Sequence, residues 1–432
     1  MPRSEAIRDP IHGYIALTPL EMRGLDGAAM QRLRRIAQLG LTELVFPGAR
    51  HSRFEHAVGA LAVVTRIFEE LRDRVGLDGW LPRIDRDPTS AEWTHLLAVA
   101  RWVALLHDVG HAPFSHVTES LLPPGETHED RSLRIVRDGD LRRVIAEGGV
   151  QLLEDVLVCL DPRTEPSDPA LVFVRETIAG PLGADRMDYL LRDSWGTGVS
   201  YGIFDLERIV HTLVPIEDPK VGGVRLGVDR GGVSATEGML WARLSMFGQV
   251  YTHHTRRILD QHLREFLGEI LPGGRYPAED QEYLAWNDVR IWEAIRTAVE
   301  AGDAPGAANA RRILRREHHR VLPMRLEGGD TSAVGTALDE WCAELRTLDP
   351  SLDPRGDLVV IGSDPSRGAE LPVRLAGEKV VPLREVSTLL DHRPSQPSAR
   401  LYVTHDARDR AIDLCESSGC FERAQASLAP RH

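Results

Sequence analysis

An apolar segment that ends in four ionisable side chains is the feature of this sequence that most restricts its fold. Residues 105–116 read Leu-Leu-His-Asp-Val-Gly-His-Ala-Pro-Phe-Ser-His. Three apolar residues precede His107 at helical spacing on its own face, namely Leu96, Ala100 and Val103. The His107 imidazole therefore extends a core stripe, and burying it beside Asp108 without partners would be costly. A divalent metal ion would remove that cost, because neutral imidazole and carboxylate are good ligands for it. His111 lies one helical turn further on, and we expect it to face the same cavity.

Two other segments carry similar side chains. Residues 52–56 read Ser-Arg-Phe-Glu-His and open a second helical stripe, in which three apolar residues share the face of His56: Ala60, Val63 and Ile67. Residues 184–189 read Ala-Asp-Arg-Met-Asp-Tyr, and helical spacing puts Asp185, Tyr189 and Asp193 on one side. The chain thus has one histidine upstream and one aspartate downstream of the His-Asp pair.

Together these residues predict a catalytic metal site. His56, His107, Asp108 and Asp185 form a four-ligand set that leaves coordination positions open for water and substrate, which distinguishes catalytic from structural sites. Each residue also has an ordinary structural alternative: a capping aspartate, a hydrogen-bonded core histidine or a surface ion pair.

The ordered motifs resemble one family. They are Asp-Pro-Ile-His-Gly at 9–13, Gln-Arg-Leu-Arg at 31–34, Gln-Leu-Gly at 38–40, Phe-Pro-Gly-Ala at 46–49, Arg-Phe-Glu-His at 53–56, residues 107–116, Thr-His-Glu at 127–129 and residues 185–193. In order and spacing, from residue 9 to about 260, the chain resembles the HD-domain metal-dependent phosphohydrolases, in particular the deoxynucleoside triphosphate triphosphohydrolase branch. Residues 375–403 resemble the C-terminal lobe of that branch more weakly.

The resemblance implies roles for the polar residues around the metal. His116 would be the general acid, and His111, His128 and Glu119 would orient it or help to hold a second ion. Histidine suits proton transfer because its pKa lies near working pH. For His128 the structural alternative is an N-cap or loop position. The implied cofactor is a divalent ion, namely Mn, Fe, Mg, Co, Ni or Zn.

Substrate contacts are also implied. Arg53 lies one helical turn before His56 and would contact the α-phosphate, as expected for a fixed cation near the metal. The residues that match outer-phosphate contacts are Arg186, Tyr189 and Arg243, where Arg186 replaces a Lys of the animal enzyme. Tyr251 would abut the base on the helix expected from about 237 to 270, and helix packing is the alternative for it and for Arg243. Phe247, on the same stripe, replaces a His.

The resemblance extends to the residues that recognise the sugar of the nucleotide. Gln38 and Asp193 match residues that bind the 3′-hydroxyl, and Leu39 matches one that crowds the 2′ position. Because a hydroxyl without room or partner is strongly rejected, we expect deoxynucleotides.

An activating nucleotide site is only partly matched. Asp26, Gln31, Arg34 and Arg208 match positions that bind guanine nucleotide between subunits of the animal enzyme. Glu5, however, stands where a Lys is expected, and residues 229–231 supply at most one of two expected basic residues. We expect a homo-oligomer, either a dimer or a tetramer. The partial match leaves open whether a nucleotide drives its assembly.

The predicted function is hydrolysis of deoxynucleoside triphosphates to deoxynucleoside and triphosphate by metal-activated water. Two alternatives remain: a nucleoside 5′-monophosphate phosphohydrolase on the same site, and a non-catalytic nucleotide sensor. The intact His116 speaks against the sensor.

Composition narrows the partners. The formal charge of −13 disfavours nucleic acid, although a local basic cleft is compatible with it. No apolar run reaches the length of a membrane span and the N-terminus has no signal-like apolar core, so we expect a cytoplasmic protein without a membrane partner. The four cysteines form no metal pattern and are expected to be reduced thiols.

The periodicity predicts a mainly α fold with a smaller C-terminal α+β lobe, and the resemblance implies that the helical core is an HD domain. We expect the catalytic core at 1–275, a helical extension at 276–325 and the lobe at 326–432. The Pro-rich stretch 162–169 predicts a loop between helices. The Arg-rich run at 311–316 is either a solvated helix face or a phosphate contact. Residues 358–361 and 401–403 read as strands around a helix at 383–390.

Overall fold

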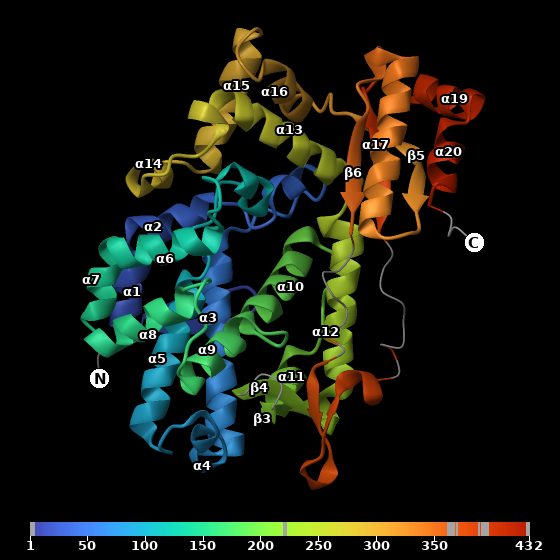
Figure 1. Cartoon of the computed structure of the whole chain (residues 1–432). Helices are drawn as coiled ribbons and strands as arrows, with labels where there is room; N and C mark the ends of the chain where they lie inside the picture. The colour runs from blue at the N-terminus through green and yellow to red at the C-terminus, as the bar shows by residue number, and fades with distance from the viewer. Residues whose placement is uncertain are drawn as a thin grey trace. The chain divides into compact units, whose positions relative to one another are not determined.

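The computed structural model describes residues 5–218, 223–360, 368, 370–387, 389 and 397–428. These residues form two compact units built from interleaved segments. The first unit comprises residues 1–243, 276–289 and 366–391, and the second comprises residues 244–275, 290–365 and 392–432. Both are mainly helical, as the sequence predicted, with small sheets (Figure 1). The division at 275 and 325, made along the linear sequence, stays a prediction.

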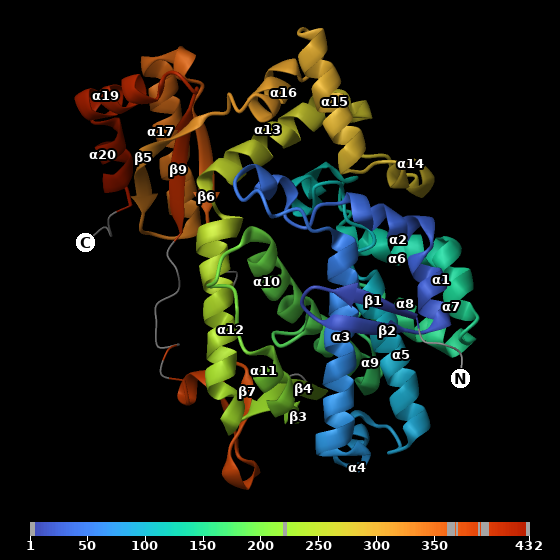
Figure 2. The same cartoon turned by 180° about the vertical axis from the view of Figure 1, so that it is seen from behind.

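Three packed helices form the centre of the first unit: α3 (Arg53–Glu70), α5 (Ser90–Leu106) and α10 (Ala184–Thr197). They lie beside one another in both views (Figures 1 and 2). The Glu55 carboxylate accepts hydrogen bonds from the Ser52 N–H and hydroxyl where α3 begins, and Thr89 caps α5. The predicted stripes along α3 and α5 are buried against the core. Each of the three helices thus has one face fixed by apolar packing.

Shorter helices surround this centre: α1 (Pro19–Leu25), α2 (Ala28–Arg32), α4 (Leu77–Trp80), α6 (His128–Asp138), α7 (Asp140–Ala146), α8 (Val150–Leu160), α9 (Pro169–Ala179), α11 (Leu206–Thr212) and α14 (Asp280–Leu284). Helices α8 and α9 flank the predicted Pro-rich loop, which is confirmed. Hairpin β1 (Glu5–Asp9) and β2 (Gly13–Leu17) lies near α3 (Figure 2). A second sheet has the order β3 (Leu213–Asp218), β4 (Gly223–Asp229), β7 (Pro372–Arg374) and β8 (Val380–Pro382).

The second unit contains a helical part and a sheet. Its helices are α13 (His254–Ile270), most of α15 (Asp288–Ala301), α16 (Ala307–Leu314), α17 (Thr331–Leu348), α19 (Arg408–Ser418) and α20 (Cys420–Ala426). Its antiparallel sheet has the order β5 (Arg320–Glu327), β9 (Ser398–Val403) and β6 (Arg355–Val359). Helix α17 packs on this sheet around the buried Trp341. Strands β6 and β9 confirm the predicted strands as far as residue 359; residue 361 lies outside the described residues.

Two helix predictions are wrong. The helix expected from 237 to 270 is interrupted: α12 (Val233–Met246) passes into a π-turn at Phe247–Tyr251, and His253 is extended and caps α13. The Thr252 N–H bonds to the Phe247 carbonyl, which closes the π-turn instead of continuing the helix. The helix expected at 383–390 is a 3₁₀ turn at Leu383–Glu385, with residues 388 and 390 outside the described residues.

Within the described part of the chain, no helix is both long and apolar enough to cross a bilayer.

Candidate metal centre and active site

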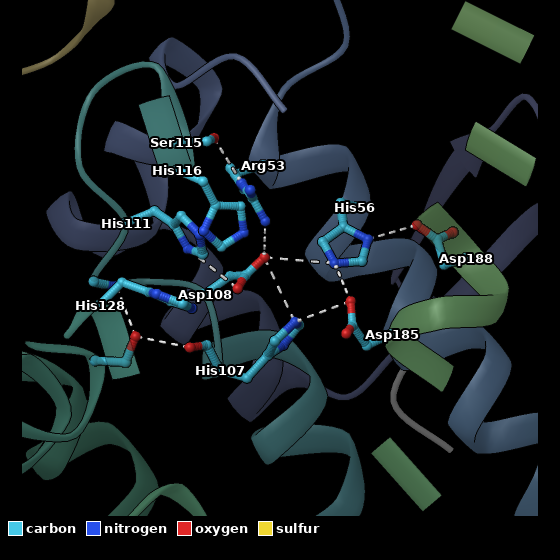
Figure 3. A network of polar contacts seen from close by, with 12 residues as sticks. Arg53, His56, His107, Asp108, His111, Ser115, His116, His128, Asp185 and Asp188 are labelled. Carbon is cyan, nitrogen blue, oxygen red and sulfur yellow. Dashed lines mark hydrogen bonds and ion pairs between the residues drawn. The ribbon is translucent and has the colours of Figure 1, made fainter. Parts of the chain in front are cut away.

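Helices α3, α5 and α10 bring the four predicted metal ligands into one cluster (Figure 3). His56 Nε2 lies 3.5 Å from Asp108 Oδ2 and 3.1 Å from Asp185 Oδ1. His107 Nε2 lies 3.5 and 3.7 Å from the same two oxygens. Ligands that are about 2.1 Å from an ion and at right angles to each other lie about 3.0 Å apart. The ligand atoms of His56, His107 and Asp108 lie close enough together to hold one divalent ion, and Asp185 Oδ1 lies beside both imidazoles at the edge of this group.

Hydrogen bonds orient both imidazoles toward this cluster. His107 Nδ1 lies 2.9 Å from the carbonyl oxygen of Ala104, and His56 Nδ1 lies 2.8 Å from Asp188 Oδ2. A carbonyl and a carboxylate can only accept, so each Nδ1 carries the hydrogen. Both Nε2 atoms are buried and have no hydrogen-bond partner among the described residues. In the neutral rings these atoms carry lone pairs, which a metal ion would satisfy.

The electrostatics of the cluster favour a cation. Burial lowers the pKa of His56, but the carboxylates of Asp185 and Asp188 outweigh burial and raise this pKa to about 10. Burial raises the pKa of Asp185, but His107 and His56 hold it well below its usual range. A group of carboxylates that stabilises an added proton also stabilises a metal ion. The side chain of Asp185 is 34% exposed whereas that of His56 is fully buried, so solvent reaches the cluster from the Asp185 side.

Arg53 contacts this cluster from α3. Its Nη1 lies 2.5 Å from Asp108 Oδ2, and its Nε donates to Ser115 Oγ over 2.9 Å (Figure 3). Arg53 is buried, and it shares Asp108 Oδ2 with both imidazoles. The side chain therefore points at the predicted metal ligands, and its α-phosphate contact stays a prediction.

A second polar group lies beside Asp108. His111 Nδ1 is 3.2 Å from Asp108 Oδ1, and the His111 ring centre is 3.9 Å from that of His128 and 4.8 Å from that of His116. Glu119 contacts both outer rings: its Oε2 lies 2.9 Å from His116 Nδ1 and its Oε1 bonds to His128. The helical-turn argument for His111 is wrong, because α5 ends at Leu106 and turns carry the chain onward. His128 is the first residue of α6, which Thr127 caps.

Within this group the predicted general acid, His116, is exposed, and Glu119, which contacts it, is ionised. The His116 side chain is 60% exposed, whereas that of His111 is 1% exposed. Burial raises the pKa of Glu119, but its bonds to His116 and His128 lower that pKa far more. Burial and the charges of Arg53 and His128 lower the pKa of His111, so His111 is neutral. Of the three histidines in this group, His116 is therefore the one with an exposed side chain.

Three predicted phosphate-binding residues lie together beside the metal cluster. The Tyr189 ring centre is 6.5 Å from that of His56. Burial raises the pKa of the Tyr189 hydroxyl, and the charges of Arg186 and Arg243 oppose this increase. Arg186 Nη1 donates to the Pro181 carbonyl over 2.9 Å, and its Nε is buried without a hydrogen-bond partner in the described chain. Two arginines thus act on one hydroxyl next to a metal ligand.

The predicted sugar-binding residues meet at His51. Its Nε2 lies 2.7 Å from Asp193 Oδ1, and its carbonyl accepts the Gln38 backbone N–H over 3.0 Å. The Gln38 Oε1 atom is buried and has no hydrogen-bond partner in the described residues, and the adjacent Leu39 is also buried. Both predicted 3′-hydroxyl contacts are therefore anchored to one histidine that the sequence analysis did not single out.

Comparison with known proteins identifies the family. Residues 53–190 match the HD domain, and residues 204–410 match the HD associated region. The HD match contains all four clustered ligands. This chain belongs to the HD-domain phosphohydrolase superfamily.

Relatives and a solved structure support this assignment. An uncharacterized protein of Methanocaldococcus jannaschii is 34% identical over 60% of this chain and 48% of its own length. The deoxynucleoside triphosphate triphosphohydrolase SAMHD1 of Danio rerio is 29% identical over 48% of this chain and 36% of its own length. A hypothetical protein of Aquifex aeolicus has a crystal structure that matches 95% of this chain and 99% of its own, with 28% identity and a TM-score of 0.76. This HD-domain protein spans about half the length of the first curated relatives.

Other predicted positions lie elsewhere in this HD-domain protein. Tyr251 belongs to the second unit, where its ring packs edge-on against Phe247 at 5.0 Å. Of the four predicted activator positions, Arg34 Nε bonds to Gln31 Oε1, and Gln31 Nε2 bonds to the carbonyl next to Asp26. Arg208 on α11 instead donates to the Gly231 carbonyl. Helices α11 and α2 lie at different ends of the first unit in both views (Figures 1 and 2).

Two buried aspartates were missed. Asp188 holds His56, and it lies within the quoted 184–189 motif, where its spacing of one turn from Asp185 was a usable signal. Asp288 accepts the backbone N–H of Ala37 and of Phe114, each over 2.7 Å. No local pattern marks Asp288, because its partners lie far away in the sequence.

Proposed function

We propose that this protein hydrolyses deoxynucleoside triphosphates to deoxynucleoside and triphosphate. The observation that carries the proposal is the placement of Arg186, Arg243 and Tyr189 beside the cluster of metal ligands. Fixed cations next to a metal centre suit a substrate with several phosphate charges. The name of the related SAMHD1 enzymes, which describes this reaction, supports the same substrate class.

His56, His107, Asp108 and Asp185 would hold the ion. When bound, a divalent metal supplies an activated water and screens phosphoryl charge. Arg53, directed at Asp108, would orient the α-phosphate for in-line attack. The remaining steps belong to side chains of the chain itself.

Cleavage of the bond between the α-phosphorus and the 5′ oxygen requires a proton on the leaving oxygen. His116 would donate it, because its side chain is exposed and its Nδ1 lies within hydrogen-bond distance of Glu119. Neutral His111 packs against the ring of His128 and fixes the position of this pair. Gln38 and Asp193 would bind the 3′-hydroxyl, while the buried Leu39 would leave no room for a 2′-hydroxyl.

Product analysis tests the proposal. Purified protein is incubated with each dNTP and with Mn²⁺, Mg²⁺, Fe²⁺, Co²⁺ or Ni²⁺, with and without GTP. We expect inorganic triphosphate and deoxynucleoside in equal amounts. Release of single phosphate from nucleoside monophosphates, with intact dNTPs, would support the monophosphate alternative. Binding without any product would support a sensor. Size measurement with and without nucleotide tests the expected homo-oligomer.

A further inference from the structure

Asp188 lies one helical turn after Asp185 on α10, outside the metal cluster, and is fully buried. Its Oδ2 is 2.8 Å from His56 Nδ1, and its Oδ1 is 2.7 Å from His12 Nε2. Arg192, one further turn along α10, donates to both oxygens over 2.9 and 2.8 Å. Both carboxylate oxygens are thus held by neighbours on three different elements. One of these neighbours, His56, is a predicted metal ligand, and its contact with Asp188 is drawn in Figure 3.

The N-terminal hairpin completes this network. Arg192 Nη1 donates to Asp9 Oδ2 over 2.9 Å, and both groups are buried. Asp9 Oδ1 accepts the backbone N–H groups of Ile11 and His12 over 2.8 and 2.9 Å, which shapes the turn between β1 and β2. That turn delivers His12 to Asp188. The position of the Asp188 carboxylate therefore depends on a hairpin that is remote in the sequence.

Gly59 on α3 makes room for the Asp188–Arg192 pair. A Cβ atom at residue 59 would lie 2.0 Å from Asp188 Oδ1 and 2.2 Å from Arg192 Nη2. Glycine inside a helix is less stable than alanine. At this position the cost is offset by the close approach of a charged pair to the backbone of the helix that carries His56.

The two histidines of the cluster differ in what holds them. The Nδ1–H of His107 is accepted by a neutral backbone carbonyl, but that of His56 is accepted by a buried carboxylate. A carboxylate fixes the ring and also makes the opposite nitrogen a stronger ligand. We propose that Asp188 is a positioning residue that directs His56 Nε2 at the metal ion, and that the His12 turn and Arg192 hold Asp188 in place. The inference rests on the metal binding assumed in the proposed function, but not on the nucleotide.

Mn²⁺ binding to the full-length protein tests the proposal without substrate. Asp188→Asn keeps the size of the side chain, but its amide removes the charge and can present a donor to His56 Nδ1, which favours the wrong tautomer. We expect the Mn²⁺ dissociation constant, measured from the free Mn²⁺ signal in electron paramagnetic resonance, to rise about 10–100-fold. The Mn²⁺ concentration that gives half-maximal turnover should rise by the same factor, while turnover at saturating Mn²⁺ largely recovers. Mere loss of folded protein would lower the amplitude without moving either midpoint.

Asp155→Asn is the matched control. Asp155 is also a largely buried carboxylate on a helix of the first unit, and its Oδ2 is likewise 2.7 Å from a histidine nitrogen, that of His95. The printed partners of Asp155 are His95 and Gln151, which are not among the predicted metal ligands. This variant should keep the wild-type Mn²⁺ affinity and activity. Gly59→Ala removes no charge but displaces the carboxylate, and it should also weaken Mn²⁺ binding.

The outcomes separate this inference from the proposed function. Wild-type protein that binds no Mn²⁺ overturns the proposed metal chemistry. Tight wild-type binding that Asp188→Asn leaves unchanged overturns the role of Asp188 alone. If Asp188→Asn does not fold, the wild-type protein is loaded with Cd²⁺ and the nitrogens of its histidine side chains are observed by NMR. This measurement shows which nitrogen of His56 binds the ion. Ligation through Nε2 with a proton on Nδ1 is expected, and ligation through Nδ1 refutes the proposal.

Discussion

Asp288 should hold the turn between His111 and His116, and Asp288→Asn tests this. Each of its two carboxyl oxygens accepts one backbone N–H, from Ala37 and from Phe114. Phe114 and Ser115 both have positive φ angles, of 58° and 60°, and such residues persist only where the surroundings hold them. The Asp288 carboxyl group therefore stabilises, through its hydrogen bond to Phe114, a strained turn between His111 and His116.

The expected loss follows from the geometry. An asparagine has one oxygen, so either the Ala37 or the Phe114 N–H would face another donor. Losing one bond to a buried carboxyl group and leaving an N–H unpaired costs about 1.5–3 kcal/mol. Urea unfolding should show a lower free energy of unfolding by this amount, and turnover should fall because the turn loosens. Asp303→Asn, at an exposed position, should change stability by less than about 0.5 kcal/mol.

The stability difference should also depend on pH. Burial raises the pKa of Asp288 to about 7, although the hydrogen bonds from the Ala37 and Phe114 N–H groups act to lower it. A carboxyl group with a raised folded-state pKa stabilises the fold below its unfolded pKa, and this stabilisation is lost as pH rises through about 7. Asparagine does not titrate. The difference in free energy of unfolding between the wild type and Asp288→Asn should therefore become smaller between pH 5 and pH 7, by at most about 1.4 kcal/mol per pH unit. A difference in free energy of unfolding that stays constant over this pH range, or that is absent at pH 5, would refute the reasoning.

Three further substitutions separate metal binding, proton transfer and sugar recognition. Asp108→Ala should abolish metal retention and turnover together, because it removes an oxygen shared by both imidazoles and Arg53; metal analysis of the purified variant checks this, and undiminished activity would overturn the ligand assignment. His116→Gln should keep the metal but lower kcat by about 10²–10⁴-fold, measured at saturating Mn²⁺; an unchanged kcat would assign the general acid elsewhere. Leu39→Ala should open space at the 2′ position and raise kcat/KM for ribonucleotides relative to deoxynucleotides, and an unchanged ratio would contradict its role.

Apolar periodicity along the chain was enough to predict the helices that carry the predicted metal ligands. Apolar stripes at helical spacing place His56 and His107 on buried faces, and this periodicity is a local property that survives in the fold. The His-Asp pair and the later Asp185 indicate metal chemistry because their burial would otherwise be costly. Periodicity gave no warning of the break at His253, because the π-turn depends on one backbone bond rather than on apolar spacing.

The groups that hold these side chains in place became visible only in the folded protein. Asp188 meets His12 across 176 positions of the chain, and Asp288 meets Phe114 across 174. A buried polar group needs a hydrogen-bond partner, and packing can supply that partner from a segment distant in the sequence. The neighbouring residues therefore do not reveal which residue the partner is. The residues that can bind a metal are thus recognisable along the chain, whereas the hydrogen bonds that aim them depend on how the hairpin and helices pack.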